Sequence, residues 1–222
     1  MRRVFLIAIL IPVALLAIAG GVTYFVYNNY TYYQTDDAQI SGQLVNVMAP
    51  AAGTLTTLSV GVGDRVSSGQ TVATVTTAPT VGANGLPTKA ATIDVTSPID
   101  GTVVQAAAVA NQAVAPGLPI LQVTDLSHLN VTAYVDESAV NNIQRGQPVD
   151  ITVDAYKDTK FSGHVQQIVP AAAGQFSLLP TQDNASGNFT KVGQRIPVVI
   201  TLDGSGKLLM PGMSVEVSIH LH

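Results

Sequence analysis

The feature that most constrains this chain is an internal repeat in which residues 47–75 recur, without a gap, as residues 95–123. Seven residues are identical in both copies; in the first copy they are Val47, Pro50, Gly53, Thr54, Val66, Gly69 and Val75. Prolines and glycines fix turns and spaced valines fix one buried face, so these residues describe a backbone pattern. Leu55 matches Val103 and Val72 matches Ile120, so the apolar positions are kept too. Each copy is too small to bury its own apolar face, which predicts one domain of two interlocked β halves.

Composition excludes several classes of protein. A length of 222 residues allows one ordinary domain or two small ones. The net charge is −4 without any basic block, which argues against nucleic acid as a partner. The chain has no cysteine, so disulfides, thiolate catalysis, cysteine-based zinc sites and a lipid-modified cysteine are excluded.

The N-terminus predicts a membrane anchor. Residues 4–26 carry no charge, and a helix of that length, about 35 Å, is enough to cross the bilayer core. Arg2 and Arg3 precede the run and the next basic residue is Arg65, so the N-terminus is expected in the cytoplasm and the rest outside. Five tyrosines follow, as in an aromatic belt: Tyr24, Tyr27, Tyr30, Tyr32 and Tyr33. A cleavable signal peptide is the alternative, because residues 17–19 offer a small-x-small site.

The remaining segments read as strands and loops. Residues 35–47 predict one leading strand, and residues 76–94 between the copies predict a loop or long hairpin because prolines and glycines interrupt them. After Asp136, which can cap a short helix, apolar alternation returns. The later strands are expected at residues 126–135, 149–154, 161–169, 196–202 and 214–221, around a long loop at 171–192. They predict a second small all-β domain, either a sandwich or a barrel.

Residues with chemical potential do not form a recognisable catalytic pattern. No Gly-x-Ser-x-Gly elbow exists, and an enzyme is not expected. His220 and His222 share one face of a predicted strand, but histidines on strand surfaces are far commoner than metal ligands, so no metal site is expected. Asp36 and Asp37 are equally open to two roles: contact with a partner, or solvation of the helix exit.

At this point the residues resemble a known family. The duplicated Pro-x-x-Gly-Thr halves resemble the lipoyl/biotinyl-like barrel-sandwich domain of bacterial membrane fusion proteins, the periplasmic adaptors of the HlyD and EmrA type. The β-barrel domain of that family is similar to VTAYVDESAVNNIQRGQPVDITVDAY and FSGHVQQIVP, and its EmrA-like closing segment to FSLLPTQDNASGNFTKVGQRIPVVI and LLMPGMSVEVSIHL. TDDAQISG fits the same branch, and residues 174–200 are the most specific part of the match.

The resemblance implies a fold, a function and partners. The expected fold is mainly β: an anchor at 1–27, a linker and leading strand at 28–45, a lipoyl-like domain at 46–125 with halves 46–75 and 95–125 around the loop 76–94, and a β-barrel domain at 126–222. The expected function is a membrane-anchored adaptor of a multidrug efflux system, with an inner-membrane exporter of the major-facilitator class, self-association and no cofactor. Most members insert a long α-helical hairpin between the halves, whereas this chain has only residues 76–94 there. An outer-membrane channel as partner is therefore doubtful, and a short form from a single-membrane bacterium is favoured.

Two alternatives to drug efflux share the same architecture. An adaptor for secretion of a peptide or polysaccharide would differ only in its transporter. A lipoyl or biotinyl carrier would use Lys89, which lies in TKAATIDVTSP. Modification requires a lysine at a tight, exposed hairpin tip, but 13 residues separate Val75 from Lys89, so a solvated loop lysine is the expectation.

Overall fold

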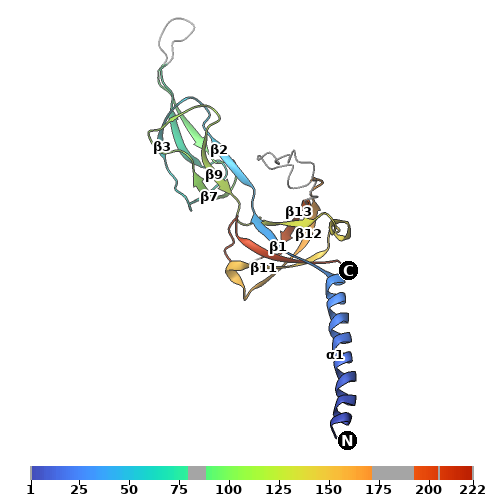
Figure 1. Ribbon diagram of the computed structural model, residues 1–222. Coiled ribbons are helices and arrows are strands. Elements are labelled where there is room, and N and C mark those ends of the chain that lie inside the picture. Colours follow the sequence, from blue (N-terminus) through green and yellow to red (C-terminus); the bar gives the residue numbers. More distant parts are fainter. Residues whose placement is uncertain (1, 80–88, 172–192, 205, 222) are drawn as a thin grey trace, which may run out of the picture. The chain divides into compact units, whose positions relative to one another are not determined.

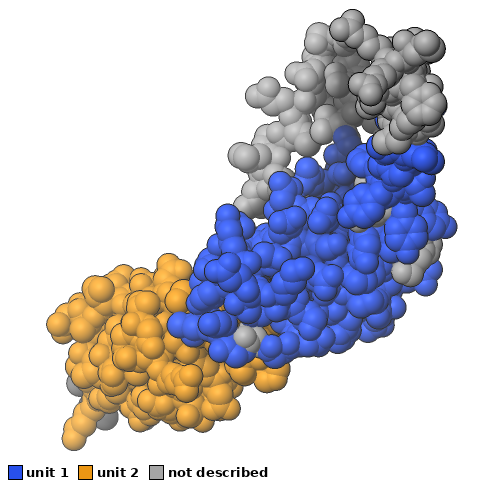
Figure 2. All heavy atoms as spheres, turned by 90° about the horizontal axis from the view of Figure 1, so that it is seen from below, with its two compact units in different colours: residues 1–40, 130–208, 212–222 blue, residues 41–129, 209–211 orange. Residues whose placement is uncertain are grey.

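The computed structural model describes residues 2–79, 89–171, 193–204 and 206–221, with the side chains of residues 2–14, 28 and 29 left aside. The chain divides into two compact units, coloured separately in Figure 2. The barrel unit contains residues 1–40, 130–208 and 212–222, and the sandwich unit contains residues 41–129 and 209–211. The predicted loop at 171–192 and the specific stretch at 174–200 lie mostly outside the described residues.

The sandwich unit contains eight described strands, and each strand of the second copy lies 48 positions after its counterpart in the first. They are β2 (Leu44–Met48), β3 (Gly53–Leu58), β4 (Arg65–Val66), β5 (Thr71–Thr76), β6 (Thr92–Thr96), β7 (Gly101–Ala106), β8 (Ala113–Val114) and β9 (Pro119–Thr124). One sheet has the order β2-β9-β7-β4, and the other has the order β6-β5-β3-β8; β2, β9 and β7 of the first sheet and β3 of the second are labelled in Figure 1. Each sheet takes strands from both copies, which confirms that the two halves interlock.

Backbone hydrogen bonds between the halves repeat the same offset. The N–H of Ala49 donates to Leu118 O at 2.9 Å, and the N–H of Gly117 donates to Ala49 O at 2.9 Å. In the equivalent positions of the other half, the N–H of Ser97 donates to Gln70 O at 2.9 Å, and the N–H of Gly69 donates to Ser97 O at 2.8 Å. The sandwich is therefore related to itself by an approximate two-fold operation.

The core of the sandwich is made of the apolar positions that the repeat conserves. The most deeply buried members of this core are each exposed by 1% or less: Leu55, Val72, Ala73, Val75, Val103, Ala108, Ile120, Leu121 and Val123. Both predicted matched pairs, Leu55 with Val103 and Val72 with Ile120, are among them. Complete burial of one such large side chain contributes about 1.5–3 kcal/mol, and neither half could supply this core alone.

The conserved glycines have two different physical reasons. Gly69 and Gly117 have φ values of +81° and +80°, a backbone conformation that side chains with a Cβ disfavour. Gly53 and Gly101 do not have positive φ; a Cβ there would lie 2.3 Å from Thr76 O and 2.5 Å from Thr124 O. The two glycines of each pair are therefore equivalent. Gly53 and Gly101, which begin β3 and β7, allow a neighbouring strand to approach closely, whereas Gly69 and Gly117 supply the left-handed turns.

The barrel unit is a closed barrel of strand order β1-β10-β13-β12-β11-β14. Its strands are β1 (Tyr32–Ser41), β10 (Asn130–Asp136), β11 (Pro148–Val153), β12 (Lys160–Ile168), β13 (Arg195–Leu202) and β14 (Ser214–His220). The predicted alternation is confirmed on β11, where Val149, Ile151 and Val153 are exposed by 2% or less. For residues 215–221 the alternation predicts four inward side chains; Val215, Val217 and Ile219 on β14 are exposed by 2% or less, whereas Leu221 follows the strand and is only partly buried.

Three predictions about local structure were wrong. Residues 35–47 form parts of two strands in different sheets, because the strand is interrupted at Gly42. A Cβ at Gly42 would lie 2.9 Å from both Leu129 Cδ2 and Thr124 Oγ1. The expected helix after Asp136 is a single 3-10 turn, Val140–Asn142, with Ile143 buried. The strand expected from residue 126 begins at Asn130, because residues 125–128 form a turn in which the N–H of Ser127 donates to Asp125 Oδ1 at 2.8 Å.

The N-terminal segment is one α-helix, α1 (Arg2–Thr31). Its apolar and tyrosine side chains from Leu15 to Tyr30 that the structure describes are 57–74% exposed. The predicted belt is only partly helical, because Tyr32 and Tyr33 belong to β1. Within the described ranges of the chain, no helix combines the length and apolarity needed to cross a membrane, so the predicted transmembrane helix is not supported.

Candidate functional site

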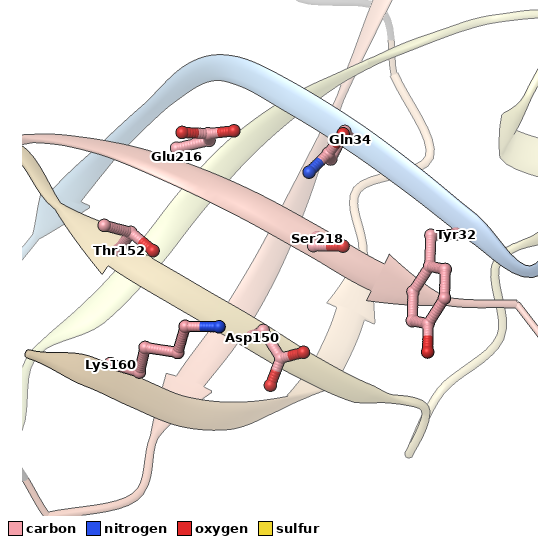
Figure 3. A pocket seen from close by; sticks show the side chains of 7 residues that line it. All are labelled: Tyr32, Gln34, Asp150, Thr152, Lys160, Glu216 and Ser218. Carbon is pink, nitrogen blue, oxygen red and sulfur yellow. The ribbon is translucent and has the colours of Figure 1, made fainter. Parts of the chain in front are cut away.

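The outer face of the barrel carries a shallow polar depression of about 260 Å³. It is lined by Tyr32, Gln34, Asp150, Thr152, Lys160, Glu216 and Ser218, which come from the four neighbouring strands β1, β14, β11 and β12 (Figure 3). Strand alternation explains this grouping: successive side chains of a strand point to opposite faces, so these residues point outward while their neighbours along each strand point into the core. The lining has two carboxylates and one amine, and the Lys160 side chain extends across β11 toward Asp150 (Figure 3).

One edge of this face is held by His220. Its Nε2 lies 2.9 Å from Asp150 Oδ2, which joins β14 to β11. Its ring also meets the ring of Tyr32 edge-on, with centroids 4.7 Å apart. The N–H of Leu221 donates to Thr31 O at 2.8 Å, so backbone pairing continues to the last residue of α1. These contacts connect the beginning of β1 with the end of β14.

The aspartates of the TDDAQISG segment lie at a β-bulge in β1, where the register with β14 shifts between Thr35 and Ala38. The buried Thr35 hydroxyl donates to Tyr134 O at 3.2 Å and accepts the N–H of Asp37 at 3.2 Å. A bulge places two successive residues opposite one, so Asp36 and Asp37 are both exposed. The Asp-Asp pair therefore lies on the barrel rather than at the helix exit.

Asp37 forms an ion pair with Arg195 at the start of β13. Since β10 lies between β1 and β13, the pair spans three strands. Close to it, the N–H of Asp136 donates to the hydroxyl of Tyr33 at 3.0 Å. Burial raises the pKa of the Tyr33 phenol, and the hydrogen bond from Asp136 opposes that shift only in part. Asp37 therefore has a structural partner, whereas Asp36 is available to an external one.

A second polar cluster ends the sandwich unit. Asp125 accepts from the Ser127 hydroxyl at 2.5 Å, and its other oxygen lies 2.5 Å from His128 Nδ1. The hydrogen bonds from Ser127, followed by the one from His128, lower the pKa of Asp125 to about 2. Ser127 Oγ and Asp125 Oδ2 lie at the same ring nitrogen, His128 Nδ1, at 3.1 and 2.5 Å, and His128 is 85% exposed, so the cluster is a capped turn and not a charge-relay arrangement.

Lys89 is exposed and lies outside any strand. The hairpin between β5 and β6 is closed by Thr77, whose N–H donates to Ala91 O at 2.8 Å, so Lys89 lies two residues from that last pair. The residues at the tip, 80–88, lie outside the described part of the chain. That Lys89 is an unmodified, solvated loop lysine therefore stays a prediction to be tested.

The three described histidines lie at separate ion pairs. His128, His164 and His220 each lie beside a different aspartate, at 2.5, 3.5 and 2.9 Å, and His222 lies outside the described residues. In the part of the chain that the structure describes, no three histidine, aspartate or glutamate side chains could hold one metal ion.

Sequence reasoning found the outward face of β11 but missed the depression, because Tyr32 and Gln34 were assigned to a belt and a linker. The sequence signal for this strand is short, because residues 34–37 are all polar and only residues 38–41 alternate between apolar and polar.

Comparisons with known proteins cover both units. A family model described as the YknX-like beta-barrel domain matches residues 129–219. YhbJ of Bacillus subtilis, which is named as an efflux system component, is 35% identical over 217 residues, or 98% of this chain and 92% of YhbJ. The multidrug export protein EmrA of Escherichia coli is 38% identical over 128 residues, 56% of this chain and 33% of EmrA. This chain thus spans about a third of that EmrA.

Solved structures show the same fold at low sequence identity. ZneB from Cupriavidus metallidurans has a TM-score of 0.64 at 19% identity, covering 85% of this chain and 98% of ZneB. The membrane fusion protein Spr0693 from Streptococcus pneumoniae has a TM-score of 0.58 at 16% identity, covering 85% of this chain and 97% of Spr0693. Together with the match along nearly all of YhbJ, these results show that the chain belongs to the membrane fusion protein family of non-enzymatic adaptors, as a short form of its EmrA-like branch.

Proposed function

We propose that this chain is the adaptor subunit of a multidrug efflux system and works with an exporter of the cytoplasmic membrane, of the major-facilitator class. The observation that carries the proposal is the similarity to YhbJ, which runs through both units and is not confined to one of them. The names of the EmrA relatives, which refer to multidrug export and colistin resistance, support a role in drug efflux.

The chemistry of the described surface supports contact rather than turnover. On the outer face of the barrel Asp37 pairs with Arg195 and Asp150 pairs with His220, while Asp36 presents an exposed carboxylate with no ion-pair partner among the described residues. An adaptor needs surfaces that meet its exporter and further copies of itself. We therefore propose that copies of this chain associate around the exporter. We also propose that each copy consists of a lipoyl-like domain at residues 46–125 and a β-barrel domain at residues 126–222.

The proposed location is the outer side of the cytoplasmic membrane, with residues 1–27 as the tether. This part rests on the uncharged run at 4–26 and on the two arginines before it. Tethering matters because it converts a weak lateral contact into an intramolecular one, and such linkage can raise apparent affinity by roughly 10²–10⁴-fold. Carbonate extraction tests the tether directly: full-length chain in the supernatant would contradict it.

Drug susceptibility tests the function. Cells that lack the chain and its exporter are complemented with both genes, and minimum inhibitory concentrations are measured for amphipathic drugs. We expect resistance to require both genes, to survive Lys89→Ala, and to fall sharply when residues 1–27 are replaced by a cleavable export signal that leaves β1 intact. Resistance from the exporter alone would contradict an adaptor role.

The Lys89→Ala variant also separates the adaptor from the carrier. Loss of resistance in this variant, together with an added mass on the wild-type chain that the variant lacks, would establish a carrier. Unmodified wild-type mass with full resistance in the variant supports the adaptor.

A further inference from the structure

The inference concerns β2, which lies at the edge of its sheet. Its only strand partner among the described residues is β9, with Val45 opposite Val123 and Asn46 opposite Gln122 (Figure 1). The strand at the equivalent edge of the second sheet is β6, which pairs with β5. An edge strand leaves a row of backbone N–H and C=O groups available to another chain.

The repeat provides a comparison of these two edges within one molecule. The outward residues of β2 are Leu44, Asn46 and Met48, and the outward residues at the same positions of β6 are Thr92, Asp94 and Thr96. All six are exposed, and Leu44 and Met48 are 53% and 51% exposed. Charged and polar side chains are the ordinary protection of an edge, so β6 is protected and β2 is not.

The difference continues beside the strand. Leu118 is 38% exposed, and its carbonyl accepts the N–H of Ala49, immediately after β2. The equivalent residue in the other half is Gln70. One of two edges with the same backbone therefore exposes leucine and methionine, and the other does not. Folding alone does not require this difference, because both positions tolerate polar residues in the same fold.

The sequence of β2, Leu-Val-Asn-Val-Met, is nearly symmetric about Asn46. Antiparallel pairing of two copies about this residue puts Leu44 opposite the second copy's Met48 and Val45 opposite its Val47. The two Asn46 amides then face each other, and an amide can donate and accept at once. The same pairing of two β6 strands would place Asp94 opposite Asp94, and like charges directly opposite destabilise a sheet. Charge thus permits self-pairing at β2 and opposes it at β6.

We propose that β2 binds β2 of a second copy of this chain as an antiparallel pair centred on Asn46. The two four-stranded sheets then form one continuous sheet across the contact. This inference rests on the proposal above that copies associate, and it names the contact. Five residues form a small interface, so the pair is weak in dilute solution and depends on the local concentration that tethered copies have.

Cysteine cross-linking tests the register, because the chain has no cysteine of its own. Asn46→Cys is expected to give a disulfide-linked dimer under mild oxidation of intact cells that express the full-length chain, since opposite residues in antiparallel strands lie about 5 Å apart at Cβ. Leu44→Cys alone should not, because its two copies lie four residues apart along the pair, about 13 Å. Leu44→Cys mixed with Met48→Cys should give the mixed dimer. Asp94→Cys is the matched control on β6.

A charge variant completes the test. Asn46→Asp copies the residue that β6 tolerates at this position, so the fold is expected to remain intact, while two carboxylates meet across the pair. Cross-linking between Leu44→Cys and Met48→Cys should then fall to the level of the Asp94→Cys control. Equal cross-linking at positions 46 and 94, or none at 46, would overturn the inference, and so would an exporter segment as the only cross-linked product.

The drug-susceptibility assay keeps this result separate from the proposed function. Resistance that persists without any β2 cross-link would leave the adaptor role standing and remove the β2 contact. Cross-links at position 46 in cells without exporter-dependent resistance would support the contact and contradict the drug-efflux role.

Discussion

Substituting the repeated glycines of the sandwich by alanine or asparagine distinguishes two reasons why a position requires glycine: close approach of a neighbouring strand, and a positive φ. At Gly53 and Gly101 the obstacle is a neighbouring strand: a Cβ would lie 2.3 Å from Thr76 O or 2.5 Å from Thr124 O. At Gly69 and Gly117 nothing lies within 4 Å, and the obstacle is the positive φ. Asparagine tolerates positive φ better than alanine does but is larger. It should therefore improve on alanine at one pair and be worse at the other.

The expected magnitudes follow from these contacts. For Gly53→Ala, relief of the contact requires the first β3–β5 pair to shift, which costs about 1–3 kcal/mol as overpacking and about 1 kcal/mol in a weakened hydrogen bond. Reduced freedom of the unfolded chain offsets about 0.4–1 kcal/mol. The net free energy of unfolding should fall by about 1–3 kcal/mol, equally for Gly101→Ala. For Gly69→Ala the left-handed backbone costs about 1–2 kcal/mol.

The assay is urea unfolding of the full-length chain in detergent, followed by circular dichroism of the β structure. We expect Gly53→Asn to be less stable than Gly53→Ala, and Gly69→Asn to be more stable than Gly69→Ala, with the same order at Gly101 and Gly117. If asparagine ranks the same way at Gly53 as at Gly69, close backbone approach is not the reason for Gly53. A difference above about 1 kcal/mol between the members of a pair would contradict their equivalence.

Three further predictions concern single side chains, each measured by the same unfolding assay. Tyr33→Phe should lower the free energy of unfolding by about 1 kcal/mol, because it leaves the N–H of Asp136 without its acceptor; an unchanged value would mean that water replaces the hydroxyl. Because the pKa of Asp125 is lowered to about 2 from its ordinary 3.8, its contribution is present above pH 4 and is lost as the pH falls through 2. The stability difference between wild type and Asp125→Asn should thus be below about 1 kcal/mol at pH 6, since more than a third of the Asp125 side chain is exposed to solvent, and should shrink toward pH 2; a difference that grows on acidification would refute the assignment. Ile151→Ala in the barrel core should cost about 2–5 kcal/mol, and a cost below 1 kcal/mol would be incompatible with its complete burial.

The parts of the fold that could be predicted from the sequence are those whose cause is local or repeated. The interlocked halves could be predicted from the repeat. Leu55 and Val103 occupy the same position in the two copies, so both are expected to be buried. The alternation in β11 and β14 was visible because each strand has one apolar face. These features depend on residues within a few positions of each other, or on a copy that can be aligned.

What could not be predicted depends on partners far along the chain. The clash that requires glycine at position 53 comes from the carbonyl of Thr76, and the break at Gly42 comes from Leu129 and Thr124. The bulge that exposes Asp36 and Asp37 is a register shift between β1 and β14, and β14 is remote from β1 in sequence. The outer depression could not be assembled for the same reason, although its residues on β11 were correctly placed outward.

The position of β1 has a consequence for the order in which the chain acquires its structure. On one side β1 pairs with β14, with Tyr32 opposite His220. The first strand of the barrel therefore cannot complete its pairing until β14 has been synthesised. The eight strands of the sandwich, by contrast, are all complete by Thr124. During synthesis from the N-terminus, an unpaired β1 therefore precedes a sandwich that can already fold, and the barrel closes only after β14 has been synthesised. Truncation after residue 213, which removes β14 and keeps residues 209–211 of the sandwich unit, should leave a protease-resistant sandwich and an open, protease-sensitive barrel.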